Sequence, residues 1–257
     1  MTAPAPSGTG FDGLTGAPPA GVRTIPPESG SSATRLVLVR HGEAVCNTTG
    51  VCGGPRGCSG LTEMGAAQVA QLRDRLMATG ELSGAALYAS VLPRAVETAS
   101  IVAGALAAPG EGAPEVRADC GLCELHPGEA DGLTWGEYAA RFDPPDWDVD
   151  PDTPLAPGAE SWTTFVARAS GALEDVAARH PGGLVVVATH AGVIEASMLA
   201  FLPIAGGRDG ARLGLRTRHA SLTTWEVDGG SWRLLGYNDG AHGLVGAGAP
   251  GRSPQQA

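Results

Sequence analysis

Several features that define other classes of protein are missing from this 257-residue sequence. No apolar run is long enough to span a bilayer, so we expect no membrane segment. Basic residues are few, with 17 Lys and Arg against 27 Asp and Glu, and a net charge of -10 disfavours nucleic-acid and anionic-membrane surfaces. Residues 1–34 lack the basic and apolar regions of a signal peptide, which predicts a cytoplasmic protein.

Composition divides the chain into a central domain between two tails. Residues 1–34 are rich in Pro, Gly, Ser, Thr and Ala, and residues 243–257 have a similar composition, so both tails are predicted to be disordered. Hydrophobic residues make up 43% of the chain, enough for residues 35–242 to form one sizeable domain.

Short apolar runs alternate with helical patterns along this central span. Strands are expected at 36–40, 85–88, near 116 and at 184–188, and a terminal hairpin at 221–227 and 232–236. Helices are expected at 61–77, 93–106, 134–142, 161–179 and after Gly192, with loops at 48–60 and 143–157. The alternation predicts an α/β fold, a three-layer α/β/α sandwich around a mostly parallel sheet, with the hairpin at one edge.

Two of the predicted strands end on histidine. Residues 36–40 run into Arg40-His41-Gly42, and residues 184–188 run into Thr189-His190, while Arg94 opens the helix after another strand. Carboxyl ends of parallel strands meet at one edge of a sheet, so these side chains are expected to converge there. Imidazole can attack or shuttle protons, and arginine matches phosphate geometry, so the pattern favours a phosphoryl site.

These segments resemble the histidine phosphatase superfamily, also called the phosphoglycerate mutase-like family. The resemblance covers roughly residues 35–244 and rests on several short motifs in family order. They are Leu38-Val39-Arg40-His41-Gly42-Glu43 with Asn47, Leu61-Thr62-Glu63-Met64-Gly65, Tyr88-Ala89-Ser90, Arg94-Ala95-Val96-Glu97-Thr98, Glu124-Leu125-His126-Pro127-Gly128, Asp131-Gly132-Leu133-Thr134, Pro157-Gly158-Ala159-Glu160-Ser161, Thr189-His190-Ala191-Gly192 and Asn238-Asp239-Gly240.

The resemblance implies a role for each polar residue and no metal or cofactor. His41 would be the nucleophile that forms a phosphohistidine, and Glu124 would protonate the leaving oxygen and later deprotonate water. The short span from Glu124 to His190 resembles the phosphatase branch and favours hydrolysis. The phosphoryl group would be held by Arg40, Asn47, Arg94 and His190.

The predicted function is therefore a metal-independent phosphomonoesterase acting on a small phosphorylated metabolite. Two alternatives remain open: a phosphoglycerate-type mutase on the same fold, and a non-catalytic module that binds phosphorylated ligands. The loop at 51–60 departs from the family pattern, with Val51 at an arginine position, so the substrate is not predicted. The oligomeric state is also open, with a homodimer as one option.

The remaining cysteines and histidines are interpreted as structural. Cys120-Gly121-Leu122-Cys123 can supply half of a zinc site, but no second such pair follows. We therefore favour free thiols over a disulfide or a metal, for this pair and for Cys46, Cys52 and Cys58. His126 either assists in the pocket or makes a local hydrogen bond, and the residues taken as structural or surface histidines are His180, His219 and His242.

Overall fold

The computed structural model describes residues 32–202 and 214–243. The tails predicted to be disordered lie almost wholly outside the described residues. At their inner ends, Thr34 begins strand β1 and Gly243 closes a 3₁₀ turn. Within the described part of the chain, no helix is long and apolar enough to cross a membrane.

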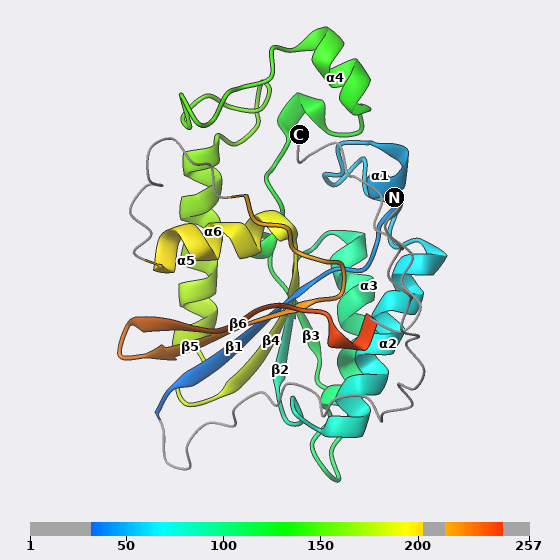
Figure 1. Ribbon diagram of the computed structural model, residues 1–257, viewed down its shortest axis with the longest axis vertical. Helices are drawn as coiled ribbons and strands as arrows, with labels where there is room; N and C mark the ends of the chain where they lie inside the picture. The colour runs from blue at the N-terminus through cyan, green and yellow to red at the C-terminus, as the bar shows by residue number, and fades with distance from the viewer. Residues whose placement is uncertain (1–31, 203–213, 244–257) are drawn as a thin grey trace, which may run out of the picture.

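One mixed sheet runs through the centre of the molecule (Figure 1). Its strands are β1 (Thr34–Arg40), β2 (Ala86–Ala89), β3 (Val116–Ala118), β4 (Leu184–Thr189), β5 (Leu222–Asp228) and β6 (Ser231–Asp239). They lie in the order β3-β2-β4-β1-β5-β6, and the first four are mutually parallel. β5 runs antiparallel to β1 and pairs with β6, which confirms the mostly parallel sheet with a hairpin at one edge.

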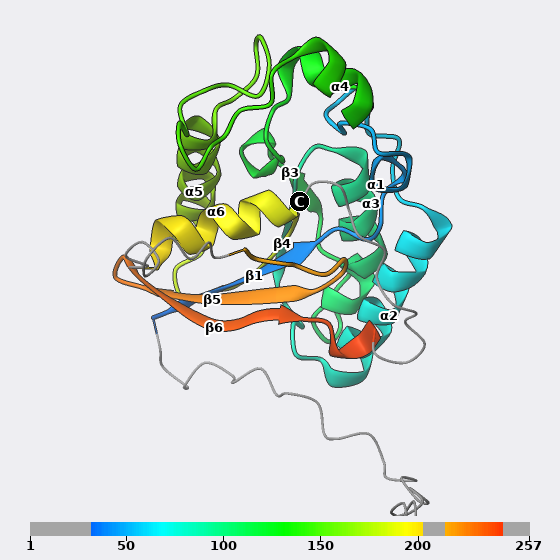
Figure 2. The same ribbon diagram turned by 45° about the horizontal axis from the view of Figure 1, so that its top comes forward.

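Helices cover both faces of this sheet. They are α1 (Val45–Thr49), α2 (Glu63–Thr79), α3 (Pro93–Val102), α4 (Trp135–Arg141), α5 (Trp162–Ala178) and α6 (Ala191–Phe201). Figures 1 and 2 show α2 and α3 on one face and α5 and α6 on the other, with α1 and α4 beyond the ends of the strands. This arrangement confirms the predicted three-layer sandwich.

The strand β1 shows why both faces are covered. Its side chains alternate, so that Val37 and Val39 pack into the core under α2 and α3, whereas Leu36 and Leu38 pack under α5 and α6. All four are fully buried, and each such burial stabilises the fold by about 1.5–3 kcal/mol. A strand that is buried on both faces needs apolar side chains at every position, and residues 36–39 are all apolar.

Local signals set the helix ends near the predicted positions. The Thr62 side chain accepts a hydrogen bond from the Gly65 N–H at 2.9 Å and caps α2. Gly80 ends that helix in the left-handed conformation, with a φ of 64°. The predicted loop at 48–60 is wrong at its start, because α1 continues to Thr49. At the start of α1, the side-chain oxygen of Asn47 accepts a hydrogen bond from the Ala44 N–H.

Strands β1 and β4 bring the two histidines to the same edge. They pair in parallel with Arg40 opposite Thr189, so the residues that follow both strands are neighbours. The His41 N–H continues the ladder by donating to the Thr189 carbonyl at 2.9 Å. The ladder therefore fixes the backbone of His41 beside that of His190.

Candidate active site

His41 and His190 form the centre of the site. Their ring centroids lie 5.1 Å apart, and both side chains are buried. Neither ring nitrogen of His190 has a hydrogen-bond partner among the described residues. Buried polar nitrogens are normally paired, so an unpaired imidazole next to a second imidazole points to a ligand that supplies the missing partner.

The orientation of His41 is fixed at both ring nitrogens. Nδ1 lies 2.6 Å from the Gly42 carbonyl oxygen, which can only accept, so Nδ1 carries the proton. Nε2 then presents its lone pair and accepts from Nε of Arg94 at 3.1 Å. In this tautomer the lone pair of the ring lies on Nε2, on the side of Arg94.

Gly42 allows this turn to lie against helix α2. A Cβ atom at residue 42 would come within 2.4 Å of the Gly65 carbonyl oxygen. Gly65 is equally restricted, because its own Cβ would lie 1.9 Å from the Glu43 carbonyl oxygen. The two glycines therefore let the backbone after β1 and the first turn of α2 approach closely enough to place His41.

Arg94 and Arg40 bring positive charge to the two imidazoles. Arg94 is buried in the first turn of α3, and its Nη1 donates to the Gly53 carbonyl at 2.7 Å. Arg40 donates to the Thr217 carbonyl. Burial lowers the pKa of Arg40 to about 10, with Arg94 adding to the shift and Glu124 opposing it, so Arg40 stays a cation at neutral pH.

Burial and positive charge keep the histidines neutral. The pKa of His41 falls well below its ordinary value, first because the ring is buried and then because Arg94 lies beside it. The pKa of His190 is lowered well below its ordinary value by burial and then by Arg94. A neutral imidazole keeps a lone pair on one ring nitrogen, which is the state that a nucleophilic histidine requires.

Glu124 lies at the N-terminus of α6. Its Oε2 accepts from the Gly192 N–H at 3.1 Å and its Oε1 from the Leu125 N–H at 3.1 Å. A Cβ at residue 192 would sit 2.1 Å from Oε1, so the glycine makes room for the carboxylate. The carboxylate is also close enough to Arg40 to raise the pKa of that guanidinium. Glu124 therefore faces the same pocket as the predicted phosphate-binding arginine.

Arg168 of helix α5 holds the segment that carries Glu124. Its guanidinium makes two 2.7 Å hydrogen bonds to the Glu160 carboxylate and reaches the carbonyls of Gly121 and Cys123 at 2.9 and 3.1 Å. Glu160 in turn accepts from the His126 N–H at 2.8 Å. Arg168 is not predicted from the sequence as a site residue, because the carbonyls of Gly121 and Cys123 that it reaches lie 47 and 45 residues away along the chain.

His219 also lies beside His41, and the sequence did not predict this proximity. We expected a structural or surface histidine, but its ring centroid lies 5.8 Å from that of His41. Its Nε2 is buried and has no partner among the described residues, and burial lowers its pKa to about 3. Residue 219 precedes β5, the strand antiparallel to β1, and its approach to the pocket follows from that pairing.

The loop after α1 is folded against the site by Asp131. Both oxygens of this carboxylate accept 2.9 Å hydrogen bonds, one from the Arg56 N–H and one from the Gly57 N–H. The thiols of Cys46, Cys52 and Cys58 are buried within or beside this loop. Burial raises the pKa of Cys52 to about 12, so this cysteine is a neutral packing residue at neutral pH.

Asn47 occupies a capping position beside the loop. Its side-chain oxygen accepts from the Ala44 N–H at 3.0 Å and so caps the start of α1, and the residue is half-buried. Trp147 of the predicted loop at 143–157 stacks on Trp162 of α5 at a centroid distance of 5.5 Å. The structure thus brings together His41, His190, Arg94 and Arg40, with Glu124 facing them.

The fold and this constellation define a histidine phosphatase. The model of the histidine phosphatase superfamily, branch 1, matches residues 36–240, so the chain belongs to that family. It is 32% identical over 210 residues to a metal-independent phosphoserine phosphatase of Arabidopsis thaliana, covering 79% of this chain and 82% of that protein.

Two solved structures show the same relationship. A mycobacterial glucosyl-3-phosphoglycerate phosphatase is 28% identical, with a TM-score of 0.60 over 79% of this chain and 98% of that one. YhfR of Bacillus stearothermophilus is 31% identical, with a TM-score of 0.62 over 78% of this chain and 95% of that one. The chain is thus an enzyme of the histidine phosphatase type.

Proposed function

We propose that the protein hydrolyses the phosphate monoester of a small metabolite through a phosphohistidine on His41. The observation that carries the proposal is the geometry of that ring. Its Nδ1 lies 2.6 Å from the Gly42 carbonyl oxygen, and its Nε2 faces Nε of Arg94 at 3.1 Å. A phosphoryl group brought to Arg94 would therefore meet a neutral nitrogen whose lone pair points toward it.

In the first half of the reaction, the Nε2 lone pair attacks phosphorus while the bond from phosphorus to the ester oxygen breaks. Glu124 supplies the proton that the departing oxygen takes up, so an alcohol leaves. Charge on the phosphoryl oxygens is balanced by Arg40 and Arg94, and His190 offers a ring N–H to the same oxygens. Asn47 is the further amide that the family resemblance assigns to this group.

In the second half, water replaces the alcohol. The Glu124 carboxylate removes a proton from the water, whose oxygen attacks phosphorus as the bond to Nε2 breaks. Inorganic phosphate leaves and His41 returns to the neutral state. Every step uses side chains of this chain, so the proposed reaction needs no metal ion.

A small phosphorylated metabolite is the substrate class that the relatives favour. Their names refer to phosphoserine and to glucosyl-3-phosphoglycerate, which are both compact phosphate monoesters. The loop at 51–60, held by Asp131, borders Arg94 through the Gly53 carbonyl and is the part of the pocket best placed to choose among such substrates.

Trapping the intermediate tests the proposal. Purified protein is mixed with a radiolabelled aryl phosphate, quenched in alkali, and examined for acid-labile, base-stable label on the protein. Wild type and the control His180→Gln should carry label and release phosphate, whereas His41→Ala should do neither, with a rate loss of at least about a thousandfold. Unchanged hydrolysis by His41→Ala would refute the proposal, as would transfer of the label to a second position of a sugar acid without release of phosphate.

A further inference from the structure

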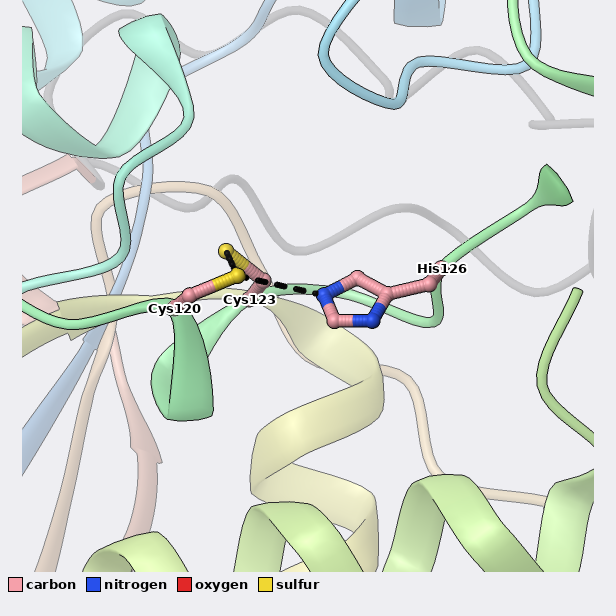
Figure 3. A group of neighbouring side chains, drawn as sticks. All are labelled: Cys120, Cys123 and His126. Carbon is pink, nitrogen blue, oxygen red and sulfur yellow. Dashed lines mark hydrogen bonds between the residues drawn. The ribbon is translucent and has the colours of Figure 1, made fainter.

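A second group of reactive side chains lies on the segment that carries Glu124. Cys120 and Cys123 belong to a short 3₁₀ turn and its cap, and His126 follows three residues later. Figure 3 shows both sulfur atoms and one ring nitrogen turned toward the same point. All three atoms lie within 4.8 Å of one another.

Two of the three separations are close to those between ligands of one tetrahedral zinc ion, and the third is within 4.8 Å. With Zn–S bonds of about 2.3 Å and Zn–N bonds of about 2.0–2.1 Å, two sulfurs stand about 3.8 Å apart and a sulfur and a nitrogen about 3.6 Å apart. The Sγ atoms of Cys120 and Cys123 lie 3.7 Å apart. Sγ of Cys120 lies 3.4 Å from Nε2 of His126. The cluster is thus arranged for a shared ion, because a disulfide would need the sulfurs about 2.05 Å apart and would leave His126 outside.

The surroundings orient these three side chains as in a protein metal site. Nδ1 of His126, the nitrogen that does not face the sulfurs, lies 3.7 Å from Oε1 of Glu160. Metal-ligating histidines commonly have a carboxylate on the side of the ring away from the metal, and Glu160 occupies that place here, at a distance longer than a hydrogen bond. Arg168 fixes the backbone of the turn by hydrogen bonds to the carbonyls of Gly121 and Cys123.

Access and coordination number also fit. Cys120 is exposed while Cys123 is buried, so an ion can enter from solvent on the Cys120 side. Three protein ligands leave one position of a tetrahedral ion free, and solvent reaches it there. Soft thiolates combined with imidazole select zinc over magnesium or calcium, which prefer oxygen ligands.

We propose that Cys120, Cys123 and His126 bind one zinc ion, with water as the fourth ligand, and that the ion braces the segment carrying Glu124. Binding exchanges two thiol protons for the metal, which are released to solvent as both sulfurs become thiolates. Along the chain, Glu124 stands between Cys123 and His126. It is not a ligand, since its carboxylate accepts hydrogen bonds from the N–H groups of Gly192 and Leu125. The ion would therefore stabilise the segment and take no part in phosphoryl transfer.

Cobalt substitution tests this site without a turnover assay. Full-length protein is reduced, desalted without chelator under argon and titrated with Co²⁺, and binding is followed by the thiolate-to-cobalt charge-transfer band and the tetrahedral visible bands. We expect one Co²⁺ per chain, displaced by one equivalent of Zn²⁺. Each of Cys120→Ser and His126→Gln should weaken the binding at least tenfold, whereas the control Cys52→Ala should leave it unchanged.

Zinc should also raise the melting temperature of the wild type but not that of Cys120→Ser, because only the native turn brings the ligands together. The proposal is overturned if fully reduced protein with five titratable thiols shows no charge-transfer band. It is equally overturned if the band survives in both ligand variants, or if it disappears in Cys52→Ala. These readouts are independent of whether His41 forms a phosphohistidine.

Discussion

The carboxylate of Glu124 rests on the backbone N–H of Gly192, with 3.1 Å between Oε2 and the nitrogen. This contact joins the segment after β3 to the first turn of α6, directly after His190. The carboxylate is thereby held in place by a residue with no side chain. A Cβ at residue 192 would lie 2.1 Å from Oε1, so only glycine permits the contact.

Gly192→Ala is therefore expected to displace Glu124 and slow the release of the leaving group. Because a general acid matters most when the departing oxygen is strongly basic, hydrolysis of phenyl phosphate should fall at least tenfold. Hydrolysis of 2,4-dinitrophenyl phosphate, whose leaving group needs no proton, should change much less. Steady-state kinetics with the two substrates measure this difference.

Gly171→Ala is the matched control. Residue 171 lies inside α5, and no atom of the residues that the structure describes stands within 4 Å of its added Cβ. Alanine there should stabilise the helix by roughly 1 kcal/mol. If Gly192→Ala slowed both substrates equally, the role proposed for Glu124 as the acid would be wrong.

The sequence predicted those parts of the site that follow from strand pattern and family motifs. Arg40, His41 and His190 stand at the ends of strands whose apolar runs are continuous, so both their positions and their convergence could be inferred. Thr62, Gly80 and Pro93 likewise gave the helix ends, because capping depends on neighbours within one turn.

Contacts between distant segments could not be inferred in this way. Arg168 reaches carbonyls about 45 residues away, and no local pattern in α5 distinguishes it from other surface arginines. His219 precedes an antiparallel strand whose pairing with β1 the sequence did not reveal. The sequence did not link His126 with the two cysteines, because the contact between His126 and Cys120 depends on how the chain turns after the 3₁₀ segment.

His219→Gln should impair binding of the phosphoryl group. The imidazole lies beside His41, and its buried Nε2 has no hydrogen-bond partner in the described part of the chain. A hydrogen bond to a charged oxygen contributes about 1.5–3 kcal/mol. We expect kcat/KM to fall about tenfold to a hundredfold, and inhibition by vanadate to weaken in parallel. His180→Gln, whose ring contacts Tyr88 at 3.0 Å, is the control and should keep both values. Wild-type inhibition by vanadate in His219→Gln would place that imidazole outside the phosphoryl site.

Arg168→Lys should destabilise the fold and slow catalysis together. A lysine cannot reproduce two parallel hydrogen bonds to Glu160 while also reaching the carbonyls of residues 121 and 123. We expect the unfolding free energy to fall by about 2 kcal/mol and kcat to fall with it, because Glu124 loses its support. Urea denaturation and steady-state assays measure both.

The control for this change is Arg141→Lys. Arg141 pairs with Glu129 at 3.0 Å on the surface, where both side chains are more than half exposed, so the loss should stay below about 1 kcal/mol. Similar losses in the two variants would show that Arg168 acts as an ordinary surface charge.

The buried histidines make the stability of the protein depend on pH. In the folded state the pKa values of His41 and His190 lie well below 6.5, whereas in the unfolded chain both rings titrate near 6.5. Below that pH the unfolded state binds more protons than the folded state, so acid favours unfolding. Each ring should then lower the unfolding free energy by up to about 1.4 kcal/mol per pH unit as the pH falls below 6.5.

Replacing one ring with a residue that does not titrate isolates this contribution. Urea denaturation of wild type and His190→Gln between pH 7.5 and pH 5 should give curves that run parallel above pH 7. Below pH 6.5 the unfolding free energy of the variant should fall less steeply than that of the wild type, because the variant lacks one of the rings that are protonated on unfolding in acid. The control His180→Gln removes a ring that is only partly buried, so its curve should stay closer to that of the wild type. Identical slopes for wild type and His190→Gln below pH 6.5 would mean that His190 binds a proton as readily in the folded protein as in the unfolded chain. In that case the imidazole would enter the reaction as a cation below pH 6.5, and the charge balance proposed for the phosphoryl pocket would have to include that charge.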